Sequence, residues 1–192
     1  REAGVECRQR RRRRSCATTD SQHRQPVARN LLRRHFQVEA LNDVWVADIT
    51  AIWTFEGWLY LAAVLDLYDH QVIGYAMADA MPVALTLEAL EMAVGRRRPE
   101  PGLIHHSDRG SQYAAGAYQQ RMDRLGFVPS MSRKGNCWDN SVMERFFGSL
   151  KSEWTDAVVY TTREAARLDV VEYIEMQYNS VRPHTTLGRL TP

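Results

Sequence analysis

An aspartate interrupts a run of apolar and β-branched residues, and this conflict limits how the chain can fold. Residues 44–50 contain only apolar or β-branched side chains apart from Asp48, a composition typical of a strand. A carboxylate among apolar neighbours raises its pKa and becomes neutral unless positive charge compensates it. Asp48 therefore has a positive partner in the folded protein, or it lies on an exposed strand face, which period-two alternation makes the face of Val46 and Thr50.

Two further acids lie at the edges of predicted elements. Asp108 ends the short run 103–108, and Glu144 lies in the first turn of an amphipathic helix predicted at 141–154. Three converging carboxylates repel one another, and a divalent cation is the usual compensation. Together, Asp48, Asp108 and Glu144 indicate a metal site for phosphoryl transfer, and so an enzyme that acts on nucleic acid.

Each acid also has an ordinary structural explanation, which the sequence leaves open. Asp48 could face solvent on a half-exposed strand, and an Asp shortly before a glycine, as at Asp108, is common in turns. Ser141 and Glu144 fit the capping-box pattern, in which the Glu side chain reaches back to the first residue of the helix. Asp66, also within an apolar strand, is the reserve carboxylate should Asp48 be structural.

The pattern of apolar residues predicts an α/β fold. Three strands in succession, separated by short polar breaks, suit an antiparallel meander. The later alternation of helices and strands suits crossover connections, so we expect a mixed five-stranded sheet with helices on both faces. The predicted strands are 44–53, 58–67, 71–78, 103–107 and 127–130, and the predicted helices are 82–95, 115–125, 141–154 and 162–181.

Positive charge is concentrated near the N-terminus. Residues 1–34 hold eleven Arg against three acids, a net charge of +8, whereas the whole chain carries +2. We predict a poorly ordered basic arm over 1–35 and a globular core with a C-terminal helix over 36–192. The arm either binds nucleic acid through phosphate contacts or is a solvated tail. Its candidate contacts are Arg10, Arg11, Arg12, Arg13 and Arg14.

The remaining composition excludes several classes of protein. The three cysteines, Cys7, Cys16 and Cys137, lack metal-ligand spacing and indicate a reducing compartment rather than a disulfide scaffold. No apolar stretch reaches the roughly 18 residues of a membrane helix, and the charged N-terminus does not resemble a signal peptide. Because the chain opens with Arg rather than Met, the sequence leaves open whether a further domain lies upstream.

Several polar residues are candidates for contacts with nucleic acid. Lys151 lies two turns after Glu144 on one helix face, where it would hold a phosphate beside the metal site. The loop 132–140 offers three side chains near the flexible Gly135, and two more follow the last predicted helix. These candidates are Arg133, Lys134, Asn136, Arg182 and His184.

Other polar residues are expected to have ordinary structural roles. His105 and His106 alternate on a strand, so at most one faces the site, and a buried structural role is expected for them. Asp139 is expected to cap the helix or to serve as a loop acid.

Four segments carry a family resemblance. Residues 44–50, 105–113, 130–147 and 178–188, with 35 residues between Asp108 and Glu144, closely resemble the OrfB-type insertion-sequence transposases. These belong to the retroviral-integrase-like DDE group, and the resemblance spans roughly residues 10–192. It implies an RNase H-like fold in which the catalytic and metal-binding triad maps onto Asp48, Asp108 and Glu144. One departure is Asp69-His70, where the family usually has Ser-Arg.

The resemblance also implies cofactors, partners and a location. It implies Mg²⁺ or Mn²⁺, with two ions, and cleavage and strand transfer of DNA at insertion-sequence ends, that is, DNA integration and recombination. The partners implied are element-end and target DNA, further copies of the chain, and an upstream helix-turn-helix region from a fused or separate reading frame. The location implied is the bacterial cytoplasm, at the nucleoid.

Three alternatives remain at this point. One is a nuclease of RNase H-like fold, acting for example on RNA–DNA hybrids. Another is a catalytically decayed element copy that only binds DNA. The third is a globule in which the acids are merely surface residues.

Overall fold

A five-stranded mixed sheet forms the centre of the computed structural model, which describes residues 16, 18–20, 22–184, 188 and 191–192. The strand order is β3-β2-β1-β4-β5, as expected for a meander extended by crossover strands. Strands β1, β2 and β3 are antiparallel, whereas β4 and β5 run parallel to β1. The bounds are β1 Val44–Thr54, β2 Gly57–Asp66, β3 Val72–Ala78, β4 Ile104–Ser107 and β5 Val128–Met131.

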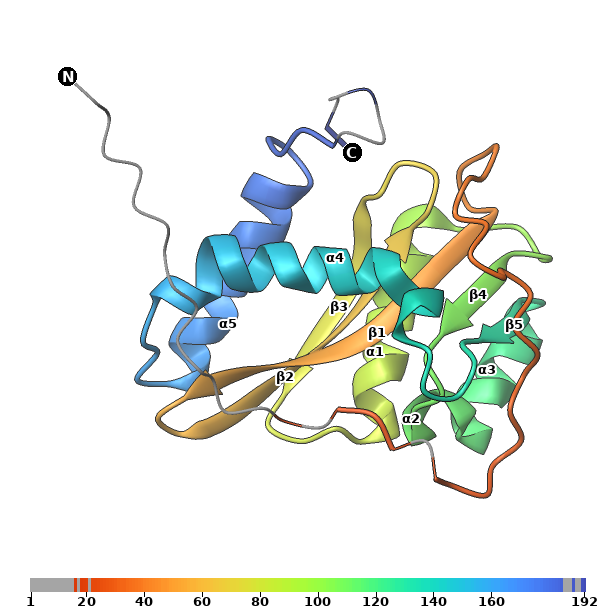
Figure 1. Cartoon of the computed structure of the whole chain (residues 1–192), viewed down its shortest axis with the longest axis horizontal. Coiled ribbons are helices and arrows are strands. Elements are labelled where there is room, and N and C mark those ends of the chain that lie inside the picture. Colours follow the sequence, from red (N-terminus) through yellow and green to blue (C-terminus); the bar gives the residue numbers. More distant parts are fainter. Residues whose placement is uncertain (1–15, 17, 21, 185–187, 189–190) are drawn as a thin grey trace.

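Helices cover both faces of this sheet. Figure 1 shows α4 crossing one face beside α5, with α1, α2 and α3 on the other side. The bounds are α1 Val83–Arg97, α2 Ser111–Ala114, α3 Gly116–Leu125, α4 Ser141–Ser149 and α5 Arg163–Glu172. The RNase H-like α/β architecture expected from the sequence is confirmed. None of the described helices combines the length and apolar character needed to cross a membrane.

Alternation along β1 divides the hydrophobic core in two. Val44 and Val46 pack with residues of α4 and α5, while Trp45, Ala47 and Ile49 pack with residues of α1 and α3. Because successive side chains point to opposite faces, Asp48 belongs to the face that α4 and α5 cover. The sheet face predicted for Asp48 is therefore correct.

Two predicted helices change their winding before they end. The predicted helix 141–154 is α4 followed by a π-helix, Leu150–Trp154, and the predicted helix 162–181 is α5 followed by a π-helix, Tyr173–Tyr178. In the first, Ser152 Oγ donates to the Gly148 carbonyl at 2.7 Å, taking an acceptor that an α-helix would use for its backbone. Apolar periodicity does not distinguish the two windings, so the change was not predicted.

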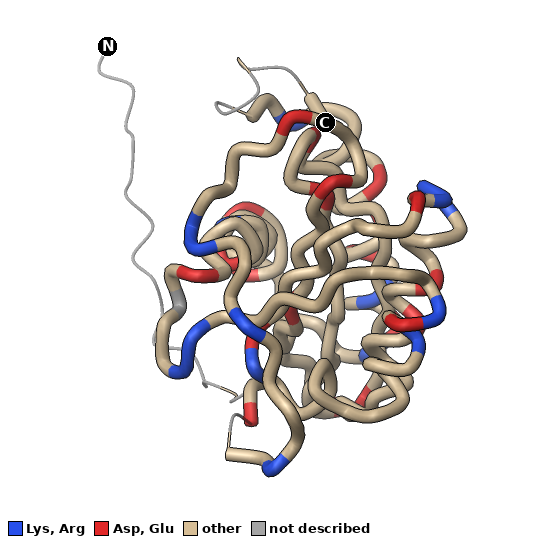
Figure 2. Tube along the Cα trace, turned by 90° about the vertical axis from the view of Figure 1, so that its right-hand side faces the viewer, with Lys and Arg blue, Asp and Glu red and all other residues tan. Residues whose placement is uncertain are grey.

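The segment before β1 is attached to the core. Leu32 is 5% exposed and belongs to the same cluster as α4. Asn30 and Arg34 hydrogen-bond to Asp139. The packed part of the chain therefore includes residues expected in the arm, while Arg10 to Arg14 lie outside the described residues. Figure 2 shows Lys and Arg interspersed with Asp and Glu along the described chain.

Candidate active site

Asp48 lies within β1, and Asp108 lies at the same level, directly after the neighbouring strand β4. β1 and β4 are parallel, and Ala47 is the register partner of Ser107, so the residue after each of these two is an aspartate. Side chains at equal register point to the same face of a sheet. Asp108 also follows the last residue of β4, at the carboxyl edge where ligand sites of α/β sheets lie. Two carboxylates distant in sequence are thus brought to one edge.

Glu144 reaches this region on α4, the helix that covers the same sheet face. The helix begins at Ser141 with Asn140 as its N-cap, so Glu144 is one position beyond that of a capping-box acid. The Glu144 side chain is exposed, whereas Asp48 and Asp108 are partly buried. The site therefore has two acids set into the sheet edge and a third on its solvent side.

The charges of these residues act on one another. Burial and the charge of Asp108 raise the pKa of Asp48 well above its ordinary value, and the charge of Glu144 adds to the shift. The Ile49 amide and the Lys151 ammonium oppose it. Burial also raises the pKa of Asp108. The structure thus places Asp108, Glu144 and Lys151 within electrostatic reach of Asp48.

The site has the donors for a hard cation. Three carboxylates supply the oxygen ligands that Mg²⁺ and Mn²⁺ prefer. A cation would also offset the burial and the neighbouring negative charge that raise the pKa of Asp48. Within the described residues, no three His, Cys, Asp or Glu side chains are gathered closely enough to hold a metal ion. The donor set fits a divalent ion, and binding requires the carboxylates to close together.

Backbone and side-chain donors already engage two of the acids. Asp48 Oδ1 accepts from the Ile49 amide at 2.8 Å, and Asp108 Oδ1 accepts from the Gly110 amide at 2.9 Å. The second oxygen of Asp108, Oδ2, accepts from the Thr19 hydroxyl at 2.5 Å. His23 Nε2 lies 2.9 Å from the Arg109 carbonyl, so the segment before the core crosses this edge of the site.

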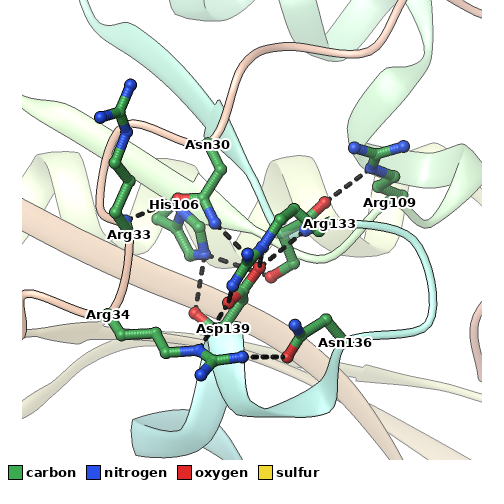
Figure 3. Close-up of polar contacts among 9 residues, drawn as sticks. Asn30, Arg33, Arg34, His106, Arg109, Arg133, Asn136 and Asp139 are labelled. Atoms are coloured by element: carbon green, nitrogen blue, oxygen red, sulfur yellow. Dashed lines mark hydrogen bonds and ion pairs between the residues drawn. The ribbon is translucent and has the colours of Figure 1, made fainter.

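The loop residues expected to bind nucleic acid are largely engaged within the protein. Arg133 pairs with Asp139 through Nε and Nη2, both at 2.8 Å, and Asn136 Oδ1 accepts from Arg34 at 3.0 Å (Figure 3). Lys134 is exposed beside Gly135, whose φ of 69° is a left-handed turn conformation. Lys134 and Arg133 are both exposed, but the guanidinium of Arg133 is already paired with Asp139.

The candidates near the C-terminus are divided. Arg182 forms an ion pair with Glu153, so its guanidinium is shared with an acid. His184 stacks edge-on against Tyr178, with ring centroids 4.9 Å apart, and burial lowers its pKa to about 4. Neither residue is an open phosphate contact. Lys151, by contrast, lies near Asp48, as its effect on that carboxyl shows.

The remaining polar candidates are structural. Asp66 is fully buried and accepts from the amides of Asn42 and Tyr68, each at 2.9 Å, so it stabilises the backbone at the end of β2. His105 lies 3.1 Å from the Tyr118 hydroxyl, and burial lowers its pKa to about 3. His106 faces the opposite side, and burial lowers its pKa to about 4. Both histidines are therefore neutral and buried.

Sequence reasoning did not identify two side chains at this site. Thr19 bonds Asp108 from 89 positions away, and Asn140 Nδ2 donates to the Ala47 carbonyl at 3.1 Å from 93 positions away. An Asn just before a helix signals a cap, which is a local role. Nothing local to either residue indicates its distant partner.

The fold and the site together define a class. An RNase H-like sheet with carboxylates on adjacent parallel strands and on a covering helix is the arrangement of integrase-type polynucleotidyl transferases. The integrase core domain model of that class matches residues 39–137, and a second integrase core domain model matches residues 125–192. The chain belongs to the integrase core family and, within it, to the insertion-sequence transposases.

Relatives of known sequence support this placement. The chain is 48% identical over 191 residues to the insertion element IS600 uncharacterized 31 kDa protein of Shigella sonnei, covering 100% of this chain and 70% of that protein. It is 44% identical over 170 residues to transposase InsF for insertion sequence IS3A of Escherichia coli strain K12, covering 88% of this chain. The chain spans 59% of the length of InsF.

Solved structures show the same fold at low sequence identity. A chain of the simian T-cell lymphotropic virus intasome, in complex with a PP2A regulatory subunit, aligns with a TM-score of 0.63 and 17% identity, over 87% of this chain and 57% of that chain. The HTLV-2 integrase catalytic core domain, in complex with magnesium and in its dimeric form, aligns with a TM-score of 0.59 and 14% identity. The alignment covers 78% of this chain and 94% of that chain. These similarities support the architecture.

Proposed function

We propose that this chain cleaves DNA at the ends of an insertion sequence and transfers the cleaved strand to a target. The observation that carries this proposal is the register of Ala47 with Ser107, which sets Asp48 and Asp108 side by side under the helix of Glu144. Such a cluster of acids is costly to a fold unless it serves to bind cations. The insertion-sequence relatives favour this function over that of a hybrid-specific nuclease.

In this proposal Asp48, Asp108 and Glu144 would together hold Mg²⁺ or Mn²⁺, as two ions. When bound, such ions neutralise charge on the phosphoryl oxygens and activate the attacking oxygen. In the first step water attacks a phosphodiester: a bond forms between phosphorus and the water oxygen while the bond to the 3′-oxygen breaks. The products are a 5′-phosphate and a 3′-hydroxyl, whose oxygen has taken up a proton. In the second, that hydroxyl attacks a target phosphodiester, forming one phosphorus–oxygen bond while another breaks and its oxygen leaves as an alcohol.

Basic residues around the acids position the DNA. Lys151, close to Asp48, holds a phosphate next to the reacting group, and Lys134 on the exposed loop adds a second contact. Arg133 and Arg182 bind DNA only by exchanging their ion pairs with Asp139 and Glu153. Asn136 and the arginines 10–14 are assigned supporting contacts with the DNA backbone. His184 makes such a contact only by leaving its packing against Tyr178.

The reaction requires further partners. Joining two element ends to one target calls for more than one active site, so we assign a homo-oligomer. Recognition of the ends is assigned to an upstream helix-turn-helix region, supplied by a fused or separate reading frame. The DNA substrate places the protein at the nucleoid in the bacterial cytoplasm.

A branched oligonucleotide tests the proposal without a known terminal sequence. In this substrate a 3′-hydroxyl lies beside a phosphodiester junction, so transesterification yields a joined strand and a released one. We expect products that require Mg²⁺ or Mn²⁺, and a loss of at least about 100-fold in Asp48→Asn, Asp108→Asn and Glu144→Gln. Glu91→Gln is the matched control, because its exposed pair with Arg121 lies on α1 and α3.

Two results would contradict the proposal. Products that persist at the control level in Asp48→Asn would remove the acids from catalysis. Cleavage of an RNA–DNA hybrid, with the branched DNA left intact, would favour the nuclease instead.

A further inference from the structure

Two residues in front of α4 connect all three elements that carry the acids. Asp139 and Asn140 close the short 3₁₀-helix Cys137–Asn140 and lead directly into the helix of Glu144. Asp139 is 0% exposed and Asn140 is 4% exposed. Buried polar groups are costly unless they are hydrogen-bonded. The carboxylate of Asp139 and the Nδ2 atom of Asn140 have partners, whereas Asn140 Oδ1 has none among the described residues.

The carboxylate of Asp139 is used by protein donors on both oxygens. Oδ1 accepts from Arg34 Nε at 3.1 Å and from Arg133 Nη2 at 2.8 Å. Oδ2 accepts from Asn30 Nδ2 at 2.9 Å, from the Arg133 amide at 3.0 Å and from Arg133 Nε at 2.8 Å. Hydrogen bonds from Arg133 hold the pKa of this carboxyl well below its usual range. Asp139 is therefore a saturated structural anion (Figure 3).

The backbone of Asp139 connects α4 to β4. His106 Nε2 lies 3.0 Å from the Asp139 carbonyl, and Nδ1 lies 2.8 Å from Ser130 Oγ. Since a carbonyl only accepts, the neutral ring carries its proton on Nε2 and donates to Asp139, while Nδ1 accepts from Ser130. His106 is two residues before Asp108, so this bond relates the start of α4 to the strand of the second acid.

The side chain of Asn140 connects α4 to β1. Its Nδ2 donates to the carbonyl of Ala47, the residue before Asp48. Glu144 follows Asn140 by four residues, about one helical turn. Glu144 thus lies about one helical turn after the residues that hydrogen-bond to β1, which contains Asp48, and to β4, which Asp108 directly follows.

We propose that Asp139 is a positioning residue: its carboxylate fixes the loop before α4 to Asn30, Arg34 and Arg133. This keeps the Asp139 carbonyl on His106 of β4 and the Asn140 side chain on Ala47 of β1, so that Glu144 faces Asp48 and Asp108. This inference rests on the proposed role of the three acids as metal ligands. Residues that orient metal ligands typically change metal affinity or activity by about 10–100-fold when they are replaced. Asp139 acts through the helix and does not touch the ion.

The test measures metal binding by the 192-residue chain in the absence of DNA. Mn²⁺ is titrated into wild type, Asp139→Asn, Asp48→Asn and the control Glu91→Gln, and free Mn²⁺ is followed by electron paramagnetic resonance. Asp139→Asn keeps the size of the side chain but removes the charge that Arg34 and Arg133 share. We expect its Mn²⁺ affinity to fall about tenfold or more, with Glu91→Gln unchanged.

Two further measurements separate positioning from simple loss of stability. Activity on the branched oligonucleotide should recover when the Mn²⁺ concentration is raised, and DNA affinity without metal should stay within about twofold of wild type. Where Asp139→Asn does not fold, Arg34→Ala is the second variant, because Arg34 is partly exposed and donates one of the five bonds. A several-fold loss of Mn²⁺ affinity is expected for it.

The outcomes distinguish this inference from the function on which it rests. One outcome is that wild type binds Mn²⁺, Asp48→Asn does not, and folded Asp139→Asn or Arg34→Ala binds it as tightly as wild type. In that case the positioning role of Asp139 is wrong. If Asp48→Asn binds Mn²⁺ as tightly as wild type, the metal site itself is misassigned, and both proposals fail.

Discussion

The Thr19 hydroxyl donates a hydrogen bond to Asp108 Oδ2 at 2.5 Å, so the segment before the core occupies an oxygen that a metal ion would need. A hydrogen bond of this kind contributes about 0.5–1.5 kcal/mol, which is about 2- to 12-fold in an equilibrium constant. We expect Thr19→Val to bind Mn²⁺ more tightly by a factor in this range, measured by titration without DNA. Thr18→Val, one residue away, is the control, and equal affinities in the two variants would show that the Thr19 contact does not compete with the ion.

The raised pKa of Asp48 predicts how stability depends on pH. Without metal, the folded protein retains a proton that the unfolded chain releases above about pH 4. Stability therefore falls as the pH rises above that value and through the folded-state pKa. We expect metal-free Asp48→Asn to melt at a higher temperature than wild type at pH 7, with a gap that narrows toward pH 4. Each 1 kcal/mol of relief corresponds to about 2–4 °C.

The buried histidines act in the opposite direction but do not affect this comparison. His105 and His106 have pKa values lowered to about 3 and about 4, so they weaken the fold as the pH falls below their unfolded value. Wild type and Asp48→Asn both contain these histidines, so the difference in melting temperature between the two proteins reports the contribution of Asp48. A gap that does not change with pH would contradict the assignment.

Lys151 should affect DNA and metal differently. Its ammonium lowers the pKa of Asp48, which means that it stabilises the same negative charge that a cation would. We expect Lys151→Met to remove one phosphate contact, which reduces the salt dependence of DNA binding by about 0.9 in the log–log slope. Its Mn²⁺ affinity without DNA should be equal to or tighter than that of wild type. Arg124→Met, on α3 across the sheet, should change neither quantity; a weaker Mn²⁺ site in Lys151→Met would show that the lysine supports the fold of the site.

Asp66 should be required for stability and not for metal binding. Its two oxygens accept hydrogen bonds from the backbone amides of Asn42 and Tyr68. In Asp66→Asn, the side-chain NH₂ group replaces one of these oxygens and faces a backbone N–H, so that hydrogen bond is lost. We expect Asp66→Asn to lower the free energy of unfolding by about 1–3 kcal/mol in chemical denaturation. Its Mn²⁺ affinity should match that of wild type, and a large loss of that affinity would restore Asp66 as the reserve ligand.

The basic arm is best tested by a deletion shorter than the arm expected from the sequence. Leu32 is in the core and Arg34 bonds Asp139, so removing residues 1–34 would damage the fold. We expect deletion of residues 1–15 to flatten the salt dependence of DNA binding, by about 0.9 in slope for each phosphate that the arm neutralises. Mn²⁺ affinity should be preserved. An unchanged slope would show that the arm does not contact DNA.

Short-range patterns in the sequence predicted much of this architecture. Alternation along residues 44–50 predicted the sheet face of Asp48, and polar breaks at Glu56 and Asp69 predicted the meander, because strand period and turn chemistry are local properties. The packing of Leu32 was missed because it depends on tertiary contacts. The winding change at Leu150 was missed because apolar periodicity does not distinguish an α-helix from a π-helix. The three acids were selected from their positions in the sequence, and the likeness to a family strengthened that choice over their ordinary structural explanations.

The role of Asp139 shows more clearly what cannot be predicted from the sequence. The sequence marks it as a helix cap or loop acid, and it does lie at the entry to α4. Its ion pair with Arg34 joins residues 105 positions apart, and no window of the sequence relates them. Long-range polar networks of this kind become visible only when the fold is known.

The two neighbours of β1 differ in how they can form during folding. β2 joins β1 through a tight hairpin in which Thr54 pairs with Gly57, so this contact closes a very short loop. β4 joins β1 only after the chain has passed through β2, β3 and α1, and the entropy of that larger closure must be overcome first. The hairpin can therefore exist early, while the reactive edge is completed late and depends on the whole domain having folded.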